Sequence, residues 1–297
     1  MKRIILLTVC ILLLGISNFK AQTWGCGERD FKCQLDVRMK ALKDDPKDPD
    51  NYYNLGIVFQ RNGSHKEAVE TFSMYISIPG LKPQLVADGY NNRAISQRAL
   101  NNLELAYADY TKAIELKPTD PIYLVNRGNL NAARKNADEA LADYARAIAI
   151  DPKYYSTYAQ RGILYVNISR IDEALRDFAK SIELNPSYAE PYYNRGTVYS
   201  GRKEYDKAIP DYTKYVSLID DPVYLADGYI NRGIANRYLG NPQKALEDFS
   251  KVIELRPKWQ NGYRARALLY REMKKPDLAT ADEKTAVDLA SKQPTND

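Results

Sequence analysis

Residues 158–186 read YAQRGILYVNISRIDEALRDFAKSIELNP, and this stretch contains each element of a pattern that recurs along most of the chain. Its most regular element is a small residue, the anchor, found at Gly56, Ala94, Gly128, Gly162, Gly196, Gly233 and Ala267. Successive anchors lie 38, 34, 34, 34, 37 and 34 residues apart. A fixed period in this range indicates a stacked array of small units rather than one globular core.

The residues around the anchor recur with it. An alanine follows every anchor after twelve residues, at Ala68, Ala106, Ala140, Ala174, Ala208, Ala245 and Ala279. An aromatic residue follows six anchors after sixteen residues, at Phe72, Tyr110, Tyr144, Phe178, Tyr212 and Phe249. Proline follows four anchors after twenty-four residues, at Pro118, Pro152, Pro186 and Pro257. The spacing predicts two helices in each copy, and the second ends before the proline because proline cannot continue it.

The linked positions resemble the tetratricopeptide repeat family over roughly Pro49 to Lys292. The resemblance implies an all-α fold, a right-handed superhelix (α-solenoid) of about seven helix-turn-helix repeats. An N-terminal capping helix is predicted from Asp30 to Leu42, ahead of the first repeat. The predicted parts are a signal peptide at 1–21, a capping segment at 22–48, the repeat array at 49–292 and a disordered tail at 293–297.

The first 21 residues have the composition of a targeting segment. Lys2 and Arg3 precede an apolar run from Ile4 to Ile16, and cleavage is predicted after Ala21. The run has 13 residues, fewer than the roughly 20 that span a membrane. We expect an exported protein, periplasmic or secreted, with no stable membrane insertion after cleavage. A retained signal anchor is the alternative.

Two cysteines, Cys26 and Cys33, remain after that cleavage. An even pair in an oxidising compartment favours a disulfide. The spacing is not that of a redox motif, and two cysteines alone do not make a zinc site. We therefore expect a structural disulfide that holds the capping segment.

Composition gives little support for an enzyme or for binding to nucleic acid. The net charge of +5 falls to +2 without Lys2, Arg3 and Lys20, which is no footprint for a polyanion. His65 is the one histidine, and we expect it in a solvated turn. Acid–base or metal chemistry that relies on histidine therefore has little to work with. We expect no catalytic activity, no metal and no cofactor.

A carboxamide stands two residues before six of the anchors, at Asn54, Asn92, Asn126, Gln160, Asn194 and Asn231. In the family that the chain resembles, this position faces the concave groove and grips the backbone of a bound peptide. The group suits that task because it both donates and accepts a hydrogen bond. The alternative is that the carboxamides satisfy neighbouring helices. We assign Tyr53, Tyr193, Arg98 and Arg237 to the same predicted groove.

Some chaperone-binding members of the family clamp a terminal carboxylate with a basic residue six positions before the anchor. Here that position holds Asp50, Asp88, Ile122, Ser156, Glu190, Asp227 and Asn261. The clamp is absent, which disfavours a receptor for chaperone tails.

Arginine precedes six anchors directly, and each of these repeats has an aspartate sixteen residues after the arginine. The first repeat has neither residue, with Leu55 and Thr71 at the two positions. This covariation predicts an ion pair between the two helices of one repeat rather than a basic binding stripe.

Two longer joints interrupt the period and resemble each other. Tyr75 and Tyr215 replace the usual alanine of the second helix, and each joint leads into the sequence Ala-Asp-Gly-Tyr. We expect the tyrosines to push neighbouring helices apart. The joints are either a relic of duplication or two hinges.

Taken with the resemblance, these features predict a non-catalytic scaffold that holds a protein or peptide partner in its groove, in the cell envelope or outside the cell. Alternatives are a glycan- or peptidoglycan-binding recruiter of envelope enzymes and a homo-oligomeric structural protein.

Overall fold

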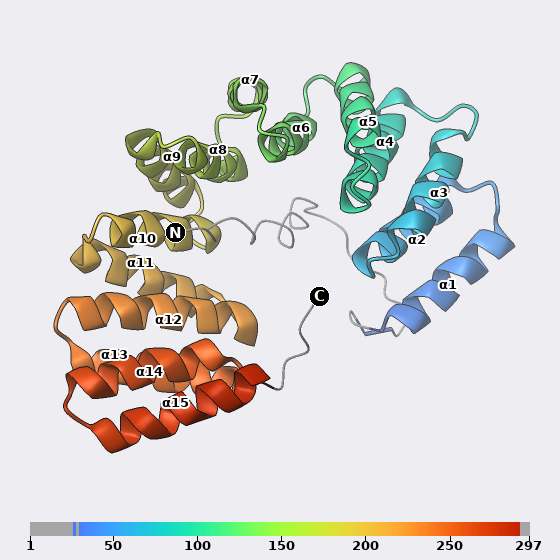
Figure 1. The fold of residues 1–297 in the computed structure, drawn as a ribbon. Helices are drawn as coiled ribbons and strands as arrows, with labels where there is room; N and C mark the ends of the chain where they lie inside the picture. The colour runs from blue at the N-terminus through green and yellow to red at the C-terminus, as the bar shows by residue number, and fades with distance from the viewer. Residues whose placement is uncertain (1–25, 28–29, 292–297) are drawn as a thin grey trace. The chain divides into compact units, whose positions relative to one another are not determined.

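The computed structural model describes residues 26–27 and 30–291, and within them the chain forms fifteen α-helices and no strand (Figure 1). It divides into two compact units, Met1–Lys117 and Pro118–Asp297, which we describe separately. The helices of the first unit are α1 (Phe31–Asp44), α2 (Pro49–Arg61), α3 (His65–Ile76), α4 (Pro83–Ala99) and α5 (Leu103–Leu116). Those of the second are α6 (Pro121–Ala133), α7 (Ala137–Ile150), α8 (Tyr155–Asn167), α9 (Ile171–Leu184), α10 (Glu190–Gly201), α11 (Tyr205–Leu218), α12 (Pro222–Tyr238), α13 (Pro242–Leu255), α14 (Gln260–Glu272) and α15 (Pro276–Ser291).

The predicted all-α repeat fold is confirmed, with each anchor in an even-numbered helix and each aromatic position in the helix that follows. Even-numbered helices of adjacent repeats contact each other: α2 with α4 in the first unit, and α6, α8, α10, α12 and α14 in succession in the second. Among the helices described, no two second helices of adjacent repeats make such a contact. The even-numbered helices of each unit therefore share one continuous surface, which we term the first-helix face.

The core of a repeat is built where the aromatic residue meets the anchor. Phe178 and Ala174 are fully buried, and Val198 of the next repeat completes their cluster. A Cβ atom added to Gly162 would lie 2.7 Å from the Phe178 ring. The glycine is thus needed for close approach, and the ring takes the space that a side chain would occupy.

The predicted arginine–aspartate pairs are confirmed in all six repeats that carry them. Arg161 Nε donates to Asp177 Oδ2 at 2.7 Å, and its terminal nitrogen donates to Oδ1 at 2.8 Å. The Asp177 side chain is 9% exposed and that of Arg161 21%. Two parallel hydrogen bonds fix the first helix of a repeat against its second, so this arginine stripe belongs to the architecture.

One aromatic position departs from an internal rule. Where the aromatic residue is tyrosine, its hydroxyl donates to the residue after the anchor: Tyr144 to Asn129 at 2.6 Å and Tyr212 to Thr197 at 3.3 Å. Where it is phenylalanine, that residue is isoleucine, at Ile57, Ile163 and Ile234. Tyr110 is the exception: the residue after its anchor is Ile95, and its buried hydroxyl has no hydrogen-bond partner among the described residues.

Replacing Tyr110 by phenylalanine is therefore expected to raise the free energy of unfolding by about 1 kcal/mol, because an unsatisfied buried hydroxyl is costly. Tyr144→Phe is the matched control and is expected to lower it by about 1 kcal/mol, because it removes a bonded hydroxyl. Denaturant unfolding measures both changes. A loss of stability in Tyr110→Phe as large as that in Tyr144→Phe contradicts this interpretation.

At the N-terminus, α1 begins one residue later and ends two residues later than the predicted capping helix. Its N-cap, Asp30, accepts a hydrogen bond from the Cys33 amide at 3.0 Å. Cys33 forms a disulfide with Cys26. The predicted signal peptide at 1–21 and tail at 293–297 lie outside the described residues, and the array is described up to Ser291.

The expectation that Tyr75 and Tyr215 push helices apart is wrong, because α3 packs against α4 and α11 against α12 across the joints. The reason is a glycine on the neighbouring helix. A Cβ atom added to Gly89 would lie 2.7 Å from the Tyr75 ring, and one added to Gly228 would lie 2.7 Å from the Tyr215 ring. Each glycine makes room for the tyrosine that faces it. The boundary between the two compact units falls at neither joint.

Candidate functional site

The predicted carboxamides differ in what they already bind. Asn92 donates to the Asp88 carbonyl and to the Tyr53 hydroxyl, both at 2.9 Å, so both of its amide hydrogens are used. Asn231 donates to the Tyr193 hydroxyl at 3.0 Å, and Gln160 donates to the Glu190 carboxylate at 3.3 Å. These groups are therefore partly structural, as the alternative interpretation predicts.

The other three carboxamides have different surroundings. Asn126 is buried. Asn54 and Asn194 are half-buried, and neither makes a hydrogen bond within residues 26–27 and 30–291. Each directly follows a tyrosine of the predicted groove, Tyr53 or Tyr193, on the same first helix. Asn54 and Asn194 are thus the carboxamides whose donors and acceptors are both available to a partner.

Tyr53 and Tyr193 belong to two similar groups of side chains. The N-terminal tyrosine cluster comprises Tyr53, Tyr75, Asp88 and Asn92, and the C-terminal tyrosine cluster comprises Tyr193, Tyr215, Asp227 and Asn231. The ring centres of the two tyrosines are 5.3 Å apart in the first cluster and 4.9 Å apart in the second. Burial raises the pKa of Tyr53 and of Tyr193 to about 12, so both hydroxyls stay protonated.

The two predicted groove arginines are half-buried and have neighbours within the chain. The charge of Arg98 partly offsets the rise in pKa that burial causes at Tyr110. Arg237 on α12 lies 3.8 Å from Glu272 on α14, and its guanidinium carbon is 4.5 Å from the centre of the Tyr238 ring. Arg237 thus links two first helices, and a role of either arginine in binding stays a prediction.

Acidic residues on the first-helix face occupy the position six residues before the anchor, where the sequence lacks a basic clamp. Burial raises the pKa of the Glu190 carboxyl group, which accepts a hydrogen bond from the Tyr188 hydroxyl. Burial also raises the pKa of Asp227, and the nearby Arg256 partly offsets this rise. Desolvated carboxylates favour positively charged neighbours. In the sequence, these carboxylates are marked by an acidic residue six positions before an anchor. This residue recurs after both joints, as Asp88 and Asp227.

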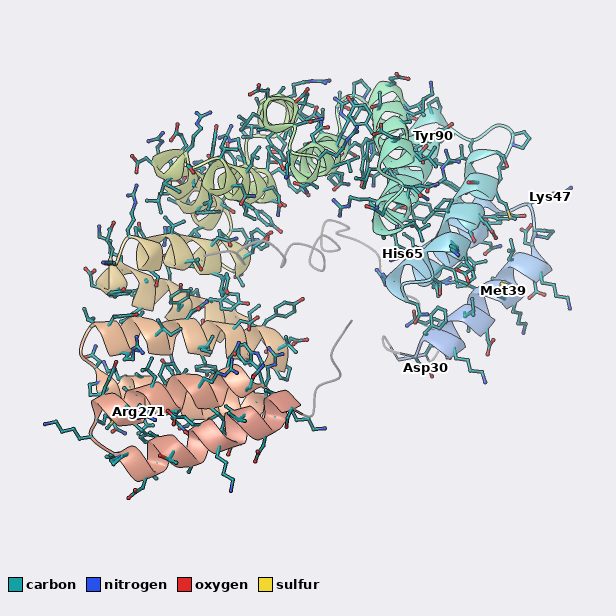
Figure 2. All side chains as sticks on the ribbon, in the orientation of Figure 1. Asp30, Met39, Lys47, His65, Tyr90 and Arg271 are labelled. Atoms are coloured by element: carbon teal, nitrogen blue, oxygen red, sulfur yellow. A yellow bond between two sulfur atoms is a disulfide. The ribbon has the colours of Figure 1, made fainter. Side chains whose placement is uncertain are left out.

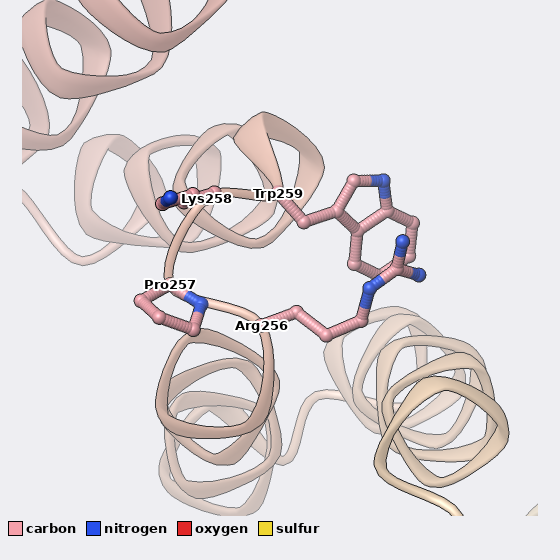
Figure 3. A pocket seen from close by; sticks show the side chains of 4 residues that line it. All are labelled: Arg256, Pro257, Lys258 and Trp259. Atoms are coloured by element: carbon pink, nitrogen blue, oxygen red, sulfur yellow. The ribbon is translucent and has the colours of Figure 1, made fainter.

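A shallow depression beside the C-terminal tyrosine cluster is lined by Arg256, Pro257, Lys258 and Trp259 (Figure 3). The Arg256 guanidinium carbon lies 4.3 Å from the centre of the Trp259 ring, and a terminal nitrogen is 3.7 Å from an Asp227 oxygen. An aromatic face and a carboxylate thus hold one guanidinium of the chain itself.

The described residues also bear on metal binding, on membrane spanning and on the position of His65. No group of three or more histidine, cysteine, aspartate or glutamate side chains is placed to hold a metal ion in the described part of the chain. No helix described here is long and apolar enough to cross a membrane. His65 begins α3 and is half-buried, not fully solvated as expected (Figure 2).

Comparison with known proteins agrees with this architecture. Tetratricopeptide repeats match at residues 39–70, 87–120, 122–154, 155–188, 178–209 and 226–258. The chain belongs to the tetratricopeptide repeat family. The repeat matches include Tyr53, Asn54, Asp88 and Asn92 in the first unit, so the N-terminal tyrosine cluster is made largely of repeat positions.

Solved structures share the fold of this tetratricopeptide repeat protein. The Cut9–Hcn1 hetero-tetramer of the APC/C is 18% identical with a TM-score of 0.62, and the match covers 89% of this chain and 50% of that one. The C-terminal part of a repeat-containing protein from Cytophaga hutchinsonii is 21% identical with a TM-score of 0.60, covering 80% and 95%.

A relative by sequence is a UDP-N-acetylglucosamine–peptide N-acetylglucosaminyltransferase of Giardia intestinalis. It is 32% identical over 80 residues, which are 27% of this chain. The chain spans 5% of the length of that relative and half the length of the Cut9–Hcn1 chain that it matches.

Proposed function

We propose that this tetratricopeptide repeat protein is a non-catalytic scaffold that binds a protein or peptide partner on its first-helix face. The observation that carries the proposal is the pair Asn54 and Asn194, which occupy equivalent positions and keep their hydrogen-bonding groups unused within the described residues. A carboxamide of this kind matches one peptide N–H and one C=O whatever the sequence of the partner.

The arrangement of polar groups supports a scaffold over an enzyme. On the first-helix face, carboxamides and carboxylates recur at fixed positions in successive repeats. A catalytic centre instead brings a nucleophile, a base and an oxyanion donor to one point. Assembly with another protein also fits the family, since a structurally similar chain belongs to the APC/C hetero-tetramer Cut9–Hcn1.

Export is the second part of the proposal. It is supported by the targeting composition of residues 1–21 and by the Cys26–Cys33 disulfide, because such bonds persist in oxidising compartments. The partner is then a component of the cell envelope or of the surroundings of the cell.

Crosslinking capture from an envelope extract of the source organism tests the proposal. The full chain is expressed in that organism, and the N-terminus of the recovered bait is read by mass spectrometry, with Gln22 expected first. The double variant Asn54→Ala with Asn194→Ala is expected to lose at least tenfold of the captured partner. Asn62→Ala with Asn167→Ala, two exposed positions at helix ends, is the matched control and should capture normally.

Equal capture by both double variants contradicts binding on the first-helix face. A bait that keeps Met1 and stays in the cytosol contradicts export. Capture that soluble peptidoglycan fragments abolish favours the glycan-binding alternative, and a mass that rises with concentration in the absence of any partner favours the homo-oligomer.

A further inference from the structure

The two tyrosine clusters are copies of one arrangement that occurs nowhere else in the array. The second-helix position nineteen residues after the anchor is Tyr75 in the first repeat and Tyr215 in the fifth. The other repeats have Ala113, Ala147, Ser181, Val252 and Ala286 there. Each of the two tyrosines is received by a glycine, Gly89 or Gly228, that lies one residue after the aspartate of its cluster. The combination of this tyrosine with the Asp-Gly pair of the next repeat is thus specific to these two places, since Gly262 in the last repeat follows Asn261 and faces Val252.

The hydroxyl groups of Tyr75 and Tyr215 are unused. The two residues are 2% and 6% exposed, yet neither makes a hydrogen bond within the part of the chain that the structure describes. Neither hydroxyl oxygen is among the fully buried atoms that lack a partner, so each hydroxyl reaches the surface while its ring stays buried. An unused hydroxyl at two equivalent places is available to a ligand.

The groups that surround each hydroxyl are acceptors. The electrostatic neighbours of Tyr75 are Tyr53, Asp88 and Asp50, from α2 and α4. Those of Tyr215 are Tyr193, Asp227, Tyr224 and Glu190, from α10 and α12. The amide hydrogens of Asn92 are already donated within the cluster, so its amide group can only accept further hydrogen bonds. Carboxylates from two consecutive repeats are therefore among the electrostatic neighbours of each hydroxyl.

We infer that each tyrosine cluster binds one basic side chain, the head group of an arginine or lysine, from a protein segment lying on the first-helix face. The carboxylates and the hydroxyl of Tyr75 or Tyr215 accept charge-assisted hydrogen bonds from the cation. The inference rests on the proposed function and adds the chemistry of the partner: basic side chains, each recognised separately at the one such site that each unit carries.

Arg256 illustrates this recognition within the chain. Its guanidinium contacts the Trp259 ring (Figure 3). It also forms an ion pair with Asp227 of the C-terminal tyrosine cluster. The carboxylate contact is offered by the cluster itself, through Asp227. The side chain of Arg256 is 30% exposed, so a cation from a partner can share or take its place beside Asp227.

Fluorescence anisotropy of the full chain with a labelled, end-capped tetra-arginine peptide tests the inference. Saturable binding with two sites per chain is expected. Tyr75→Phe with Asp88→Asn should remove one site, and Tyr215→Phe with Asp227→Asn should remove the other. All four changes together should weaken binding at least tenfold. Circular dichroism and thermal melting first confirm that each variant folds, and the Tyr75→Phe and Tyr215→Phe single variants, which keep the ring, serve if one does not.

The matched control is Glu70→Gln with Glu247→Gln, which removes the same charge from exposed positions on second helices. Its affinity should stay within twofold of the unchanged protein. End-capped tetra-lysine should bind at the same sites, because the carboxylates supply most of the attraction. Binding of tetra-glutamate as tight as that of tetra-arginine, or an affinity that the four changes leave intact, overturns the inference.

Failure of this inference is distinguishable from failure of the proposed function. If tetra-arginine does not bind while envelope capture still depends on Asn54 and Asn194, the scaffold proposal stands and the cationic chemistry of the partner is rejected. If capture is also independent of Asn54 and Asn194, both are rejected.

Discussion

Arg161→Ala is expected to lower the free energy of unfolding by about 3–5 kcal/mol, because it leaves a buried carboxylate without its cation. Asp177 is 6% exposed and receives two hydrogen bonds from Arg161. The loss therefore reflects the stranded charge of Asp177 rather than the net contribution of the pair, which is far smaller.

A double-mutant cycle on Arg161→Ala and Asp177→Ala, followed by denaturant unfolding, separates these two quantities. The double variant should be more stable than Arg161→Ala alone. Arg202 and Asp172 provide the control, because their side chains are 39% and 71% exposed and also form an ion pair. A cycle on that pair should give a coupling of about 0–1 kcal/mol. A coupling for Arg161 and Asp177 no larger than this is incompatible with their structural role.

The repeat architecture could be predicted because every repeat meets the same packing requirement with the same kinds of residue. A short side chain at Gly162 and a large one at Phe178 satisfy each other, and the chain repeats that solution. The arginine–aspartate pair could be predicted for a related reason: Leu55 and Thr71 depart together in the first repeat. Internal covariation carries information about contact within a repeat.

Contacts between repeats were harder to predict. Whether Asn92 is available depends on Tyr53 of the preceding repeat, and Asn54 bonds with no such neighbour among the residues that the structure describes. The carboxamides look equivalent in the sequence, but their partners come from positions that do not recur. The same reason explains the wrong expectation for Tyr75, since Gly89 lies on the next helix and compensates for the larger side chain.

The candidate site could therefore be predicted from the sequence only in part. Asn54, Tyr53 and their equivalents were chosen from a position that recurs, whereas the unused hydroxyls of Tyr75 and Tyr215 depend on burial and on the absence of a partner. The sequence did contain a sign of them, because two joints shared a tyrosine and an Ala-Asp-Gly-Tyr segment.

Phe178→Ala is expected to cost about 3–5 kcal/mol of unfolding free energy, since it removes a fully buried ring and leaves a cavity. The ring packs against Gly162, Ala174 and Val198, which cannot move far to fill the space. Leu278→Ala is the control, because Leu278 is 47% exposed and its truncation should change stability by less than about 0.5 kcal/mol.

The loss should also be local, and this distinguishes a repeat array from a globular core. Helix α9 contacts α8 and α10 and no other helix described in the second unit. In such an array stability is a sum of repeat terms and nearest-neighbour terms. Hydrogen exchange in Phe178→Ala should therefore speed up first in α8, α9 and α10, while α13 to α15 keep more protection. Equal loss of protection throughout α6 to α15 contradicts nearest-neighbour coupling and indicates one cooperative core. Because binding on the first-helix face needs adjacent first helices held in register, Phe178→Ala should then weaken partner binding without touching any residue of that face.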